Sequence, residues 1–175
     1  MINNYTIRLA TAADIKQIAK LYIKSWRQTY VGLLCQEYLD SLTEEAVSER
    51  WCSYIKEPRH GIFVAVHEDQ DRAEAGLRVL GFGAFKPYHR IDDCIYIESL
   101  HVDESCQGQG IGSAIIKQIY AIGKEGNYGQ MAVCLVKGND KARALYTKLG
   151  AVHYRDKVDD FTGEISYSEI LTWQL

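Results

Sequence analysis

Three glycines stand at alternate positions in the segment CQGQGIGSA, namely Gly108, Gly110 and Gly112, directly ahead of an apolar run with helical spacing. The first N–H groups of a helix have no partner inside the helix, and the helix dipole places partial positive charge there. Glycines let a diphosphate approach the backbone closely, so that these N–H groups can converge on it. No lysine or arginine lies between Glu104 and Lys117, so an anion bound here would be held mainly by backbone dipoles.

The spacing of the glycines excludes two familiar phosphate-binding loops. A Walker A loop needs Lys and then Ser or Thr after its last glycine, whereas Gly112 is followed by Ser113 and Ala114. A Rossmann fingerprint has two residues before its third glycine, whereas these three glycines are evenly spaced. A flexible turn that binds nothing is the other interpretation of the glycines taken alone.

Hydrophobic periodicity indicates the elements that must position this stretch. Strands are expected at 5–9, 61–67, 78–86, 94–102, 131–136, about 151–157 and 164–173. Helices are expected from a capping box at Thr11 and Asp14 to about residue 27, at roughly 43–56, from the glycines to about 124, and between Asn139 and Gly150. The acidic stretch 68–74 is interpreted as a hydrated turn and not as a calcium loop. We therefore expect one α/β domain over 1–175, with a mixed sheet and helices packed on its faces.

Two segments together resemble the GNAT superfamily of acyl-CoA-dependent N-acyltransferases. Gln107, Gly110 and Gly112 match that family's Q/R-x-x-G-x-G/A motif, directly after a strand that ends in ESLHV. Asn139, Ala142, Tyr146 and Gly150 match its N-x-x-A-x-x-x-Y-x-x-x-G segment. The order of the elements, β-α-α-β-β-β-α-β-α-β-β, is also that of the family, so the resemblance extends over nearly the whole chain. It implies a central, mostly antiparallel sheet with helices on both faces.

The resemblance also implies acetyl-CoA as cosubstrate and a place for each part of it. The pantetheine arm is expected to pair like an extra strand with the backbone of Leu100, His101 and Val102. In the family this slot exists because the strand at 94–102 splays away from the strand at 131–136, and neither a splay nor a bulge is visible in the sequence. The cofactor site implied in this way consists of Leu100, His101, Val102, Gln107, Gly108, Gln109, Gly110, Ile111, Gly112, Ser113, Asn139 and Tyr146.

Acyl transfer to an amine needs a neutral nucleophile, a donor for the oxyanion and help for the leaving thiolate. Glu98 is the candidate base, directly or through water, and a structural ion pair is its alternative role. On a regular strand Glu98 and Leu100 face the same side, and His101, a weaker candidate, faces the opposite one. Tyr146 is the candidate acid by resemblance to the family, and its alternative role is core packing. The histidine spacing predicts no metal site.

The acceptor amine is expected near the segment SWRQTYVGLL. Trp26 and Tyr30 are four residues apart and share a face if the first helix continues. The segment resembles a bacterial GNAT group with the pattern W-x-x-x-Y-x-G-[LI]-[LI], whose acceptors are mostly unassigned. Trp26, Arg27 and Tyr30 are therefore the candidate substrate-binding residues, with core packing as the alternative role of Trp26.

The composition is that of a compact globular protein. Of the 175 residues 47% are hydrophobic and 25% are charged, and the net charge is −3, which argues against nucleic acid as a partner. Five scattered cysteines without a C-x-x-C pair, no signal-peptide pattern and no apolar run of about 20 residues predict a cytoplasmic protein without a membrane span. We expect an N-acetyltransferase that acts on a small-molecule or peptide amine, with a homodimer possible by resemblance. The alternative is an acyl-CoA-binding module without transferase activity.

Overall fold

A seven-stranded sheet organises the computed structural model, which describes residues 5–69, 76–161 and 164–175. The strand order is β1-β2-β3-β4-β5-β7-β6, and every neighbouring pair is antiparallel except β4 with β5. The strands are β1 (Thr6–Leu9), β2 (Gly61–Asp69), β3 (Gly76–Pro87), β4 (Cys94–Val102), β5 (Gln130–Val136), β6 (Val152–Phe161) and β7 (Glu164–Gln174).

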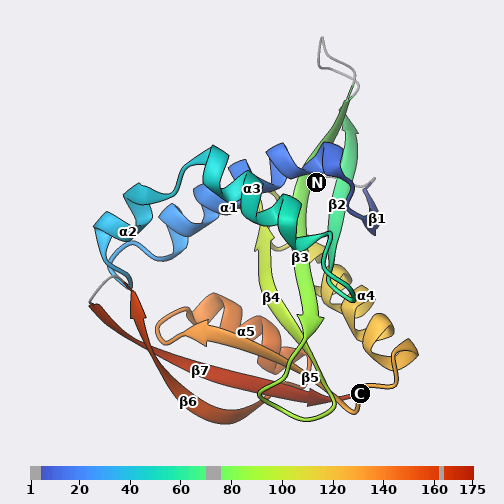
Figure 1. Ribbon diagram of the computed structural model, residues 1–175, viewed down its shortest axis with the longest axis vertical. Coiled ribbons are helices and arrows are strands. Elements are labelled where there is room, and N and C mark those ends of the chain that lie inside the picture. Colours follow the sequence, from blue (N-terminus) through green and yellow to red (C-terminus); the bar gives the residue numbers. More distant parts are fainter. Residues whose placement is uncertain (1–4, 70–75, 162–163) are drawn as a thin grey trace.

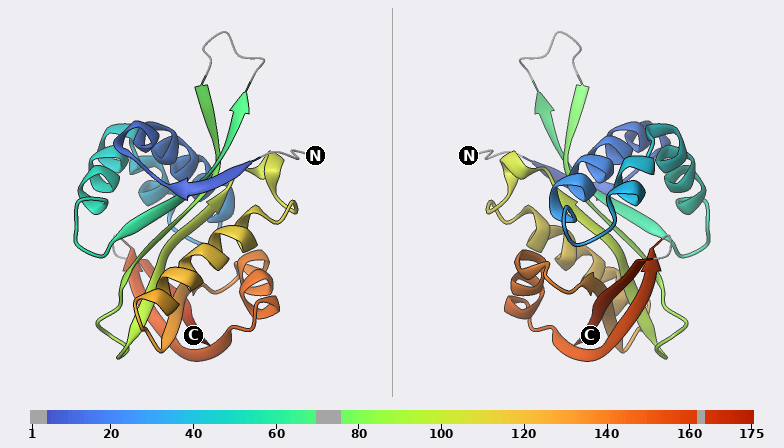
Figure 2. Two further views of the ribbon diagram at one scale, coloured as in Figure 1. Left: turned by 90° about the vertical axis from the view of Figure 1, so that its right-hand side faces the viewer. Right: turned by 90° about the vertical axis from the view of Figure 1, so that its left-hand side faces the viewer.

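Helices cover both faces of this sheet, as Figures 1 and 2 show. The helices are α1 (Ile15–Thr29), α2 (Gln36–Ser41), α3 (Glu44–Tyr54), α4 (Ile111–Glu125) and α5 (Asp140–Lys148). One core lies between the sheet and α1 and α3, around fully buried residues such as Ile18, Trp51 and Phe82. A second core lies on the opposite face under α4, around Ile115 and Ile119. The expected mixed, mostly antiparallel sheet with helices on both faces is confirmed.

Helix α1 begins at the capping box that the sequence predicted. The backbone N–H of Thr11 donates to the Asp14 carboxylate at 2.8 Å, and the Thr11 hydroxyl donates to the same oxygen at 3.0 Å. Arg8 of β1 holds the Asp14 carboxylate with two bonds of 2.8 Å. These bonds fix the direction in which α1 leaves β1 and crosses the sheet.

The six-residue helix α2 was not expected from the sequence. Its segment QEYLDS buries only Leu39 completely, so it carries no repeating apolar face that could signal a helix.

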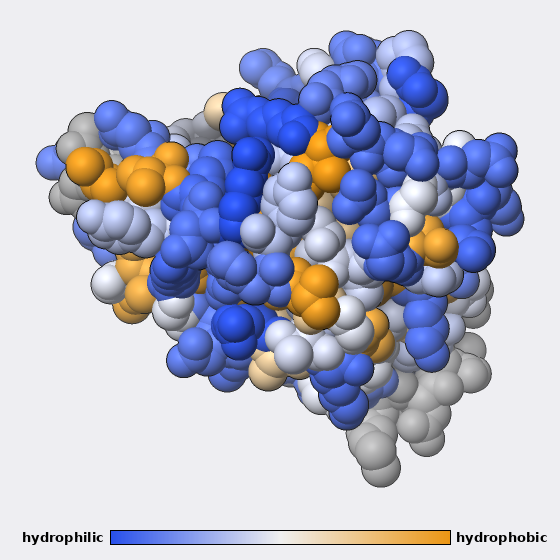
Figure 3. Space-filling model, turned by 90° about the horizontal axis from the view of Figure 1, so that it is seen from below, coloured by the Kyte–Doolittle hydropathy of each residue, from blue (hydrophilic) through white to orange (hydrophobic). Residues whose placement is uncertain are grey.

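The predicted turn at 68–74 falls largely outside the described residues. Within the described residues no helix is long and apolar enough to cross a membrane. Seen from below, the surface has small apolar groups separated by hydrophilic residues (Figure 3).

Candidate active site

The parallel strands β4 and β5 separate halfway along their length. They pair from Cys94 opposite Gln130 to Ile97 opposite Val133, whereas β4 continues to Val102 and β5 to Val136. Figure 1 shows β5 turning away from β4. We call the unpaired facing edges, residues 98–102 of β4 and 134–136 of β5, the open edge. An extended chain could add to the sheet here, because the backbone groups along this edge lack a strand partner among the described residues.

A β-bulge at Glu98 corrects one expectation. On β3, Phe85 pairs with Ile97 and the preceding Ala84 pairs with Ser99, so Glu98 is the extra residue of β4. The alternation of side chains is therefore shifted. Leu100 packs against the core under α4, whereas Glu98 lies on the opposite face. The expectation that Glu98 and Leu100 share a face is wrong.

The same bulge places His101 on the face of Glu98, contrary to expectation. The His101 ring lies 5.3 Å from the rings of Tyr22 and Phe82, and its Nδ1 is 2.8 Å from the Ser25 hydroxyl. Burial, followed by the charge of Arg50, lowers the pKa of His101 to about 3. The ring is thus neutral, enclosed and held by α1.

Leu100 and Val102 offer the backbone groups that face the open edge. The N–H of Asp103 donates to Leu80 of β3 at 2.8 Å. Residues of an antiparallel strand alternate in the direction of their backbone groups, so Leu100 and Val102 point away from β3 and His101 points toward it. The Gln107 side chain donates to the Val102 carbonyl at 3.2 Å. Of the three residues predicted to pair with pantetheine, the structure brings two to the open edge.

The glycine stretch forms the turn that starts α4 at one end of β4. Gly108 and Gly110 have φ values of 75° and 83°, a region that residues with a side chain rarely adopt. Gly110 is the N-cap, and its carbonyl accepts from Ala114 at 2.9 Å. The N–H groups of Ile111, Gly112 and Ser113 precede that first helical bond and have no partner inside the helix. The N–H groups without a helical partner therefore lie at the glycine stretch, as the sequence predicted.

Tyr146, Tyr30 and Asn139 come together although they belong to distant segments. Asn139 caps α5 by accepting the Ala142 N–H at 3.2 Å, and its side chain is also hydrogen-bonded to the Tyr30 hydroxyl. Tyr146 is 5% exposed and stands edge-on to Trp173. Burial, and next the nearby Tyr30, raise the pKa of Tyr146 above its usual range. The candidate acid therefore keeps its proton at neutral pH.

Cys134 and Tyr96 lie beside the open edge, and neither was expected there from the sequence. Cys134 is the first residue of β5 after the last pair with β4, and its thiol is hydrogen-bonded to Ser168 and Tyr96. Burial is the main cause that raises the pKa of both groups, and Glu98 and Tyr146 both act on Tyr96 electrostatically. Tyr96 thus responds to the charge state of both the candidate base and the candidate acid. Neither residue belongs to a motif, so the sequence carries no signal for them.

Two cations hold the Glu98 carboxylate. Lys86 Nζ lies 2.7 Å from one oxygen and Arg50 Nη2 lies 3.2 Å from the other. The Arg50 guanidinium also lies over the ring of Trp51 at 5.0 Å and donates to the Tyr22 hydroxyl at 3.1 Å. Three separate segments meet here, which explains why the sequence showed only the glutamate. The alternative role of Glu98 in ion pairs is therefore present in the structure.

The other two predicted acceptor residues have different surroundings. Trp26 packs against Tyr22, Tyr30 and Tyr38, at centroid distances between 4.8 and 5.7 Å. The Arg27 guanidinium donates to the carbonyls of Leu39 and Leu42, at 3.3 and 3.1 Å, and so fastens the end of α2 to α1. Trp26 is thus next to Tyr30, whereas the bonds of Arg27 lead to α2.

A mixed sheet that opens beside a helix start with free N–H groups is the architecture expected of acyl-CoA-dependent acyltransferases. Residues 17–151 match the model of the acetyltransferase (GNAT) family. The uncharacterized N-acetyltransferase YuaI of Bacillus subtilis is 30% identical over 77% of this chain and 73% of its own length. The chain belongs to the GNAT family and is an N-acetyltransferase.

Solved structures show the same fold at low sequence identity. Phosphinothricin acetyltransferase of Sinorhizobium meliloti, in complex with AcCoA, superimposes with a TM-score of 0.74 at 18% identity, covering 100% of this chain and 89% of that one. The ribosomal-protein-alanine N-acetyltransferase of Brucella melitensis gives a TM-score of 0.74 at 16% identity, covering 97% and 99%. The fold is therefore shared along the whole chain.

Proposed function

We propose that the protein transfers the acetyl group of acetyl-CoA to a primary amine of a small molecule or peptide, by direct attack of the amine on the thioester. The observation that carries this proposal is the end of β4–β5 pairing at Ile97 and Val133, next to a helix start with free N–H groups. A pantetheine arm fits the open edge because Leu100 and Val102 present backbone groups to it. The pyrophosphate then meets the N–H groups between Gln107 and Ser113, with Asn139 on the side of α5.

Tyr146 serves the leaving thiolate in this proposal. Its pKa is raised by burial, so it is protonated at neutral pH and can donate a hydrogen bond. Complete proton transfer to a thiolate with a pKa of about 8.5 is uphill from a phenol, whose ordinary pKa is about 10, and burial adds to that difference. Tyr146 therefore acts mainly by hydrogen-bond stabilisation of the developing negative charge.

Glu98 accepts the proton of the amine, directly or through water. Presenting a lysine-like amine in neutral form at pH 7 costs about 4–5 kcal/mol, whereas an α-amine costs about 1 kcal/mol. Lys86 and Arg50 orient the carboxylate, and their positive charges also disfavour the ammonium form of an incoming acceptor. The oriented carboxylate and the disfavoured ammonium form both favour attack by the neutral amine.

Tyr30 lines the acceptor side in this proposal, since it is hydrogen-bonded to Asn139 and acts electrostatically on Tyr146. Trp26 joins it there because the two rings pack against each other. His101 is left out of the cofactor site and Arg27 out of the acceptor site, because their bonds are directed elsewhere. The names of the two structural neighbours suggest the first acceptors to test, which are phosphinothricin and a peptide that begins with alanine.

We also propose that the protein works in the cytoplasm. Cys52, Cys94, Cys106 and Cys134 are free thiols in the structure. Scattered free cysteines are typical of proteins from a reducing compartment. Fractionation of cells that express the tagged protein tests this proposal, and recovery with the membrane or secreted fraction would oppose it.

Calorimetric titration with acetyl-CoA, with ATP and NADH as controls, tests the first step. Saturable binding of acetyl-CoA alone supports the proposed cofactor site. Release of free thiol with one of the two acceptors then demonstrates transfer. Binding without turnover across a broad panel of amines would instead favour an acyl-CoA-binding module, and no binding by the folded protein would refute the proposal.

A further inference from the structure

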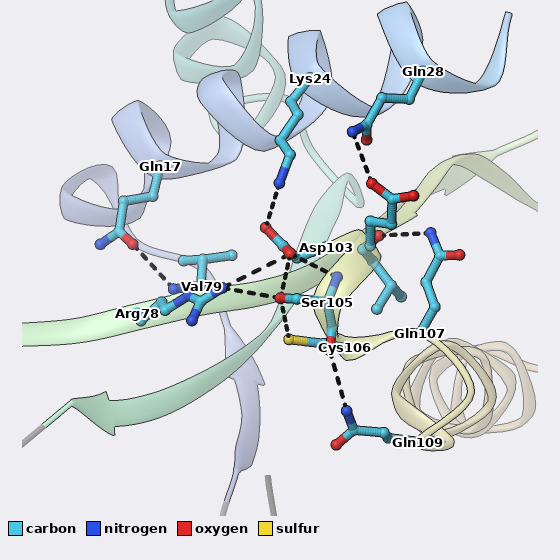
Figure 4. A network of polar contacts seen from close by, with 12 residues as sticks. Gln17, Lys24, Gln28, Arg78, Val79, Asp103, Ser105, Cys106, Gln107 and Gln109 are labelled. Carbon is cyan, nitrogen blue, oxygen red and sulfur yellow. Dashed lines mark hydrogen bonds and ion pairs between the residues drawn. The ribbon is translucent and has the colours of Figure 1, made fainter. Parts of the chain in front are cut away.

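A polar network joins helix α1 to the turn that precedes the glycine stretch. Lys24 Nζ lies 3.2 Å from the Asp103 carboxylate, and one helical turn later the Gln28 amide donates to Glu104 at 3.0 Å. Figure 4 shows both side chains reaching from α1 to this turn. The contacts connect residues more than 70 positions apart in the sequence, so no local pattern requires them.

Asp103 is the centre of the network. One of its carboxylate oxygens accepts from the N–H and the hydroxyl of Ser105, at 3.0 and 2.6 Å, while the other meets Lys24. Arg78 of β3 reaches the same group, with 3.8 Å to Asp103 and 3.3 Å to the Ser105 hydroxyl. The Asp103 side chain is only 15% exposed. A carboxylate with so many partners at the end of β4 fixes the direction in which the chain leaves the sheet.

That direction determines where the glycine stretch begins. Residues Glu104–Cys106 form a short 3₁₀ turn, in which Cys106 donates to the Asp103 carbonyl at 2.8 Å and its side chain is completely buried. The Gln109 amide then donates to the Ser105 carbonyl at 3.3 Å. The backbone from Asp103 to Gln109 is thus held by successive bonds, and the free N–H groups of α4 follow directly.

Helix α1 is also the element that carries Tyr30 to Asn139 and Tyr146. Lys24 and Gln28 hold the same helix to the cofactor side through Asp103 and Glu104. We propose that Asp103 is a positioning residue for acetyl-CoA, which holds the turn that aims the pyrophosphate-binding N–H groups and, through Lys24, couples cofactor binding to the position of α1. This inference rests on the proposed function.

The direction in which the acetyl-CoA affinity changes on neutralising Asp103 separates a positioning role from a purely electrostatic one. Acetyl-CoA is an anion, so neutralising a nearby carboxylate strengthens its binding if Asp103 acts only by its charge. If Asp103 positions the turn, Asp103→Asn weakens binding instead. We expect about a tenfold increase in the calorimetric Kd, equivalent to about 1.4 kcal/mol. Asp92→Asn is the charge-matched control, since Asp92 lies in the exposed connection before β4, and its Kd is expected to stay within twofold of the wild type.

Coupling is measured by hydrogen exchange of the amides in α1. In the wild type, saturating acetyl-CoA is expected to slow exchange at residues 24–30 as well as at 107–113. In Lys24→Gln the protection at 107–113 remains but that at 24–30 is lost. Lys20→Gln is the matched control on the same helix, because its ion pair goes to Glu44 at 3.9 Å, and it is expected to behave like the wild type.

The outcomes separate this inference from the proposed function. If the wild-type protein does not bind acetyl-CoA, the proposed function fails. If the wild type binds but Asp103→Asn binds equally well or better, with an unchanged melting temperature, the positioning role is refuted. If Lys24→Gln keeps the ligand-induced protection of α1, the coupling is refuted while the cofactor site stands.

Discussion

Removing the hydroxyl group of Tyr146 tests the chemistry most directly. Tyr146→Phe keeps the ring, which is 5% exposed and packs 5.7 Å from the Trp173 ring, and deletes only the oxygen. Assistance by a positioned acid is worth about 10²–10⁴-fold, so we expect kcat to fall about 100-fold, or about 2.7 kcal/mol. The Kd of acetyl-CoA is expected to change less than threefold, because the backbone of 107–113 holds the pyrophosphate in our proposal.

The pH dependence adds a second criterion for Tyr146. Burial raises its pKa, so it stays protonated beyond the pH at which an ordinary tyrosine ionises. We therefore expect no loss of wild-type kcat due to this residue up to about pH 10. Thiol release at saturating acetyl-CoA, with the first acceptor found, is the assay, and Tyr167→Phe at an exposed position is the control. An unchanged kcat in Tyr146→Phe would remove the residue from the mechanism.

Three further predictions concern the sheet and its charged groups. Gly83→Ala would place a Cβ 2.5 Å from Ile115 Cγ2, so we expect the free energy of unfolding, measured with urea, to fall by about 1–3 kcal/mol. Adding Ile115→Val should restore part of this loss, and a Gly83→Ala variant as stable as the wild type would contradict the packing. The pKa of about 3 for buried His101 predicts that stability falls by up to about 1.4 kcal/mol per pH unit from pH 6.5 downward, because the unfolded chain binds a proton that the folded one does not. His101→Gln should lose that part of the slope, and an identical slope would count against the assignment. Glu98→Gln should reduce kcat for an acceptor with a pKa near 10 more than for one near 8, and equal losses would show that Glu98 is not the base.

The sequence predicted what short-range patterns can encode. The strand CIYIESLHV was predicted with the bounds that the structure has, and the capping box at Thr11 and the cap at Asn139 were both found. The free N–H groups at the start of α4 follow from glycines directly ahead of an apolar helix. Each of these signals lies within a few residues of the chain, where hydrophobic spacing and turn chemistry act.

The bulge at Glu98 and the surroundings of its carboxylate could not be predicted in this way. The bulge is defined by pairing with Ala84 and Phe85 of β3, more than ten positions earlier in the chain. Within β4 its only trace is the pair of adjacent polar residues, Glu98 and Ser99, which does not by itself reveal the pairing. Lys86 and Arg50 reach Glu98 from two other elements. Partners of this kind depend on tertiary packing, so charge patterning along one strand does not reveal them.

In the proposed function, the bulge also lets one strand face both substrates. Without it, Glu98 and Leu100 would face the same side, and a base on the acceptor side would require Leu100 to leave the core under α4. With it, Leu100 and Val102 keep their side chains in that core and their backbone groups on the open edge. Glu98 meanwhile turns toward Arg50 of α3. The extra residue therefore separates the proposed thioester side from the proposed acceptor side within one strand, and it lies directly after the last pair between β4 and β5.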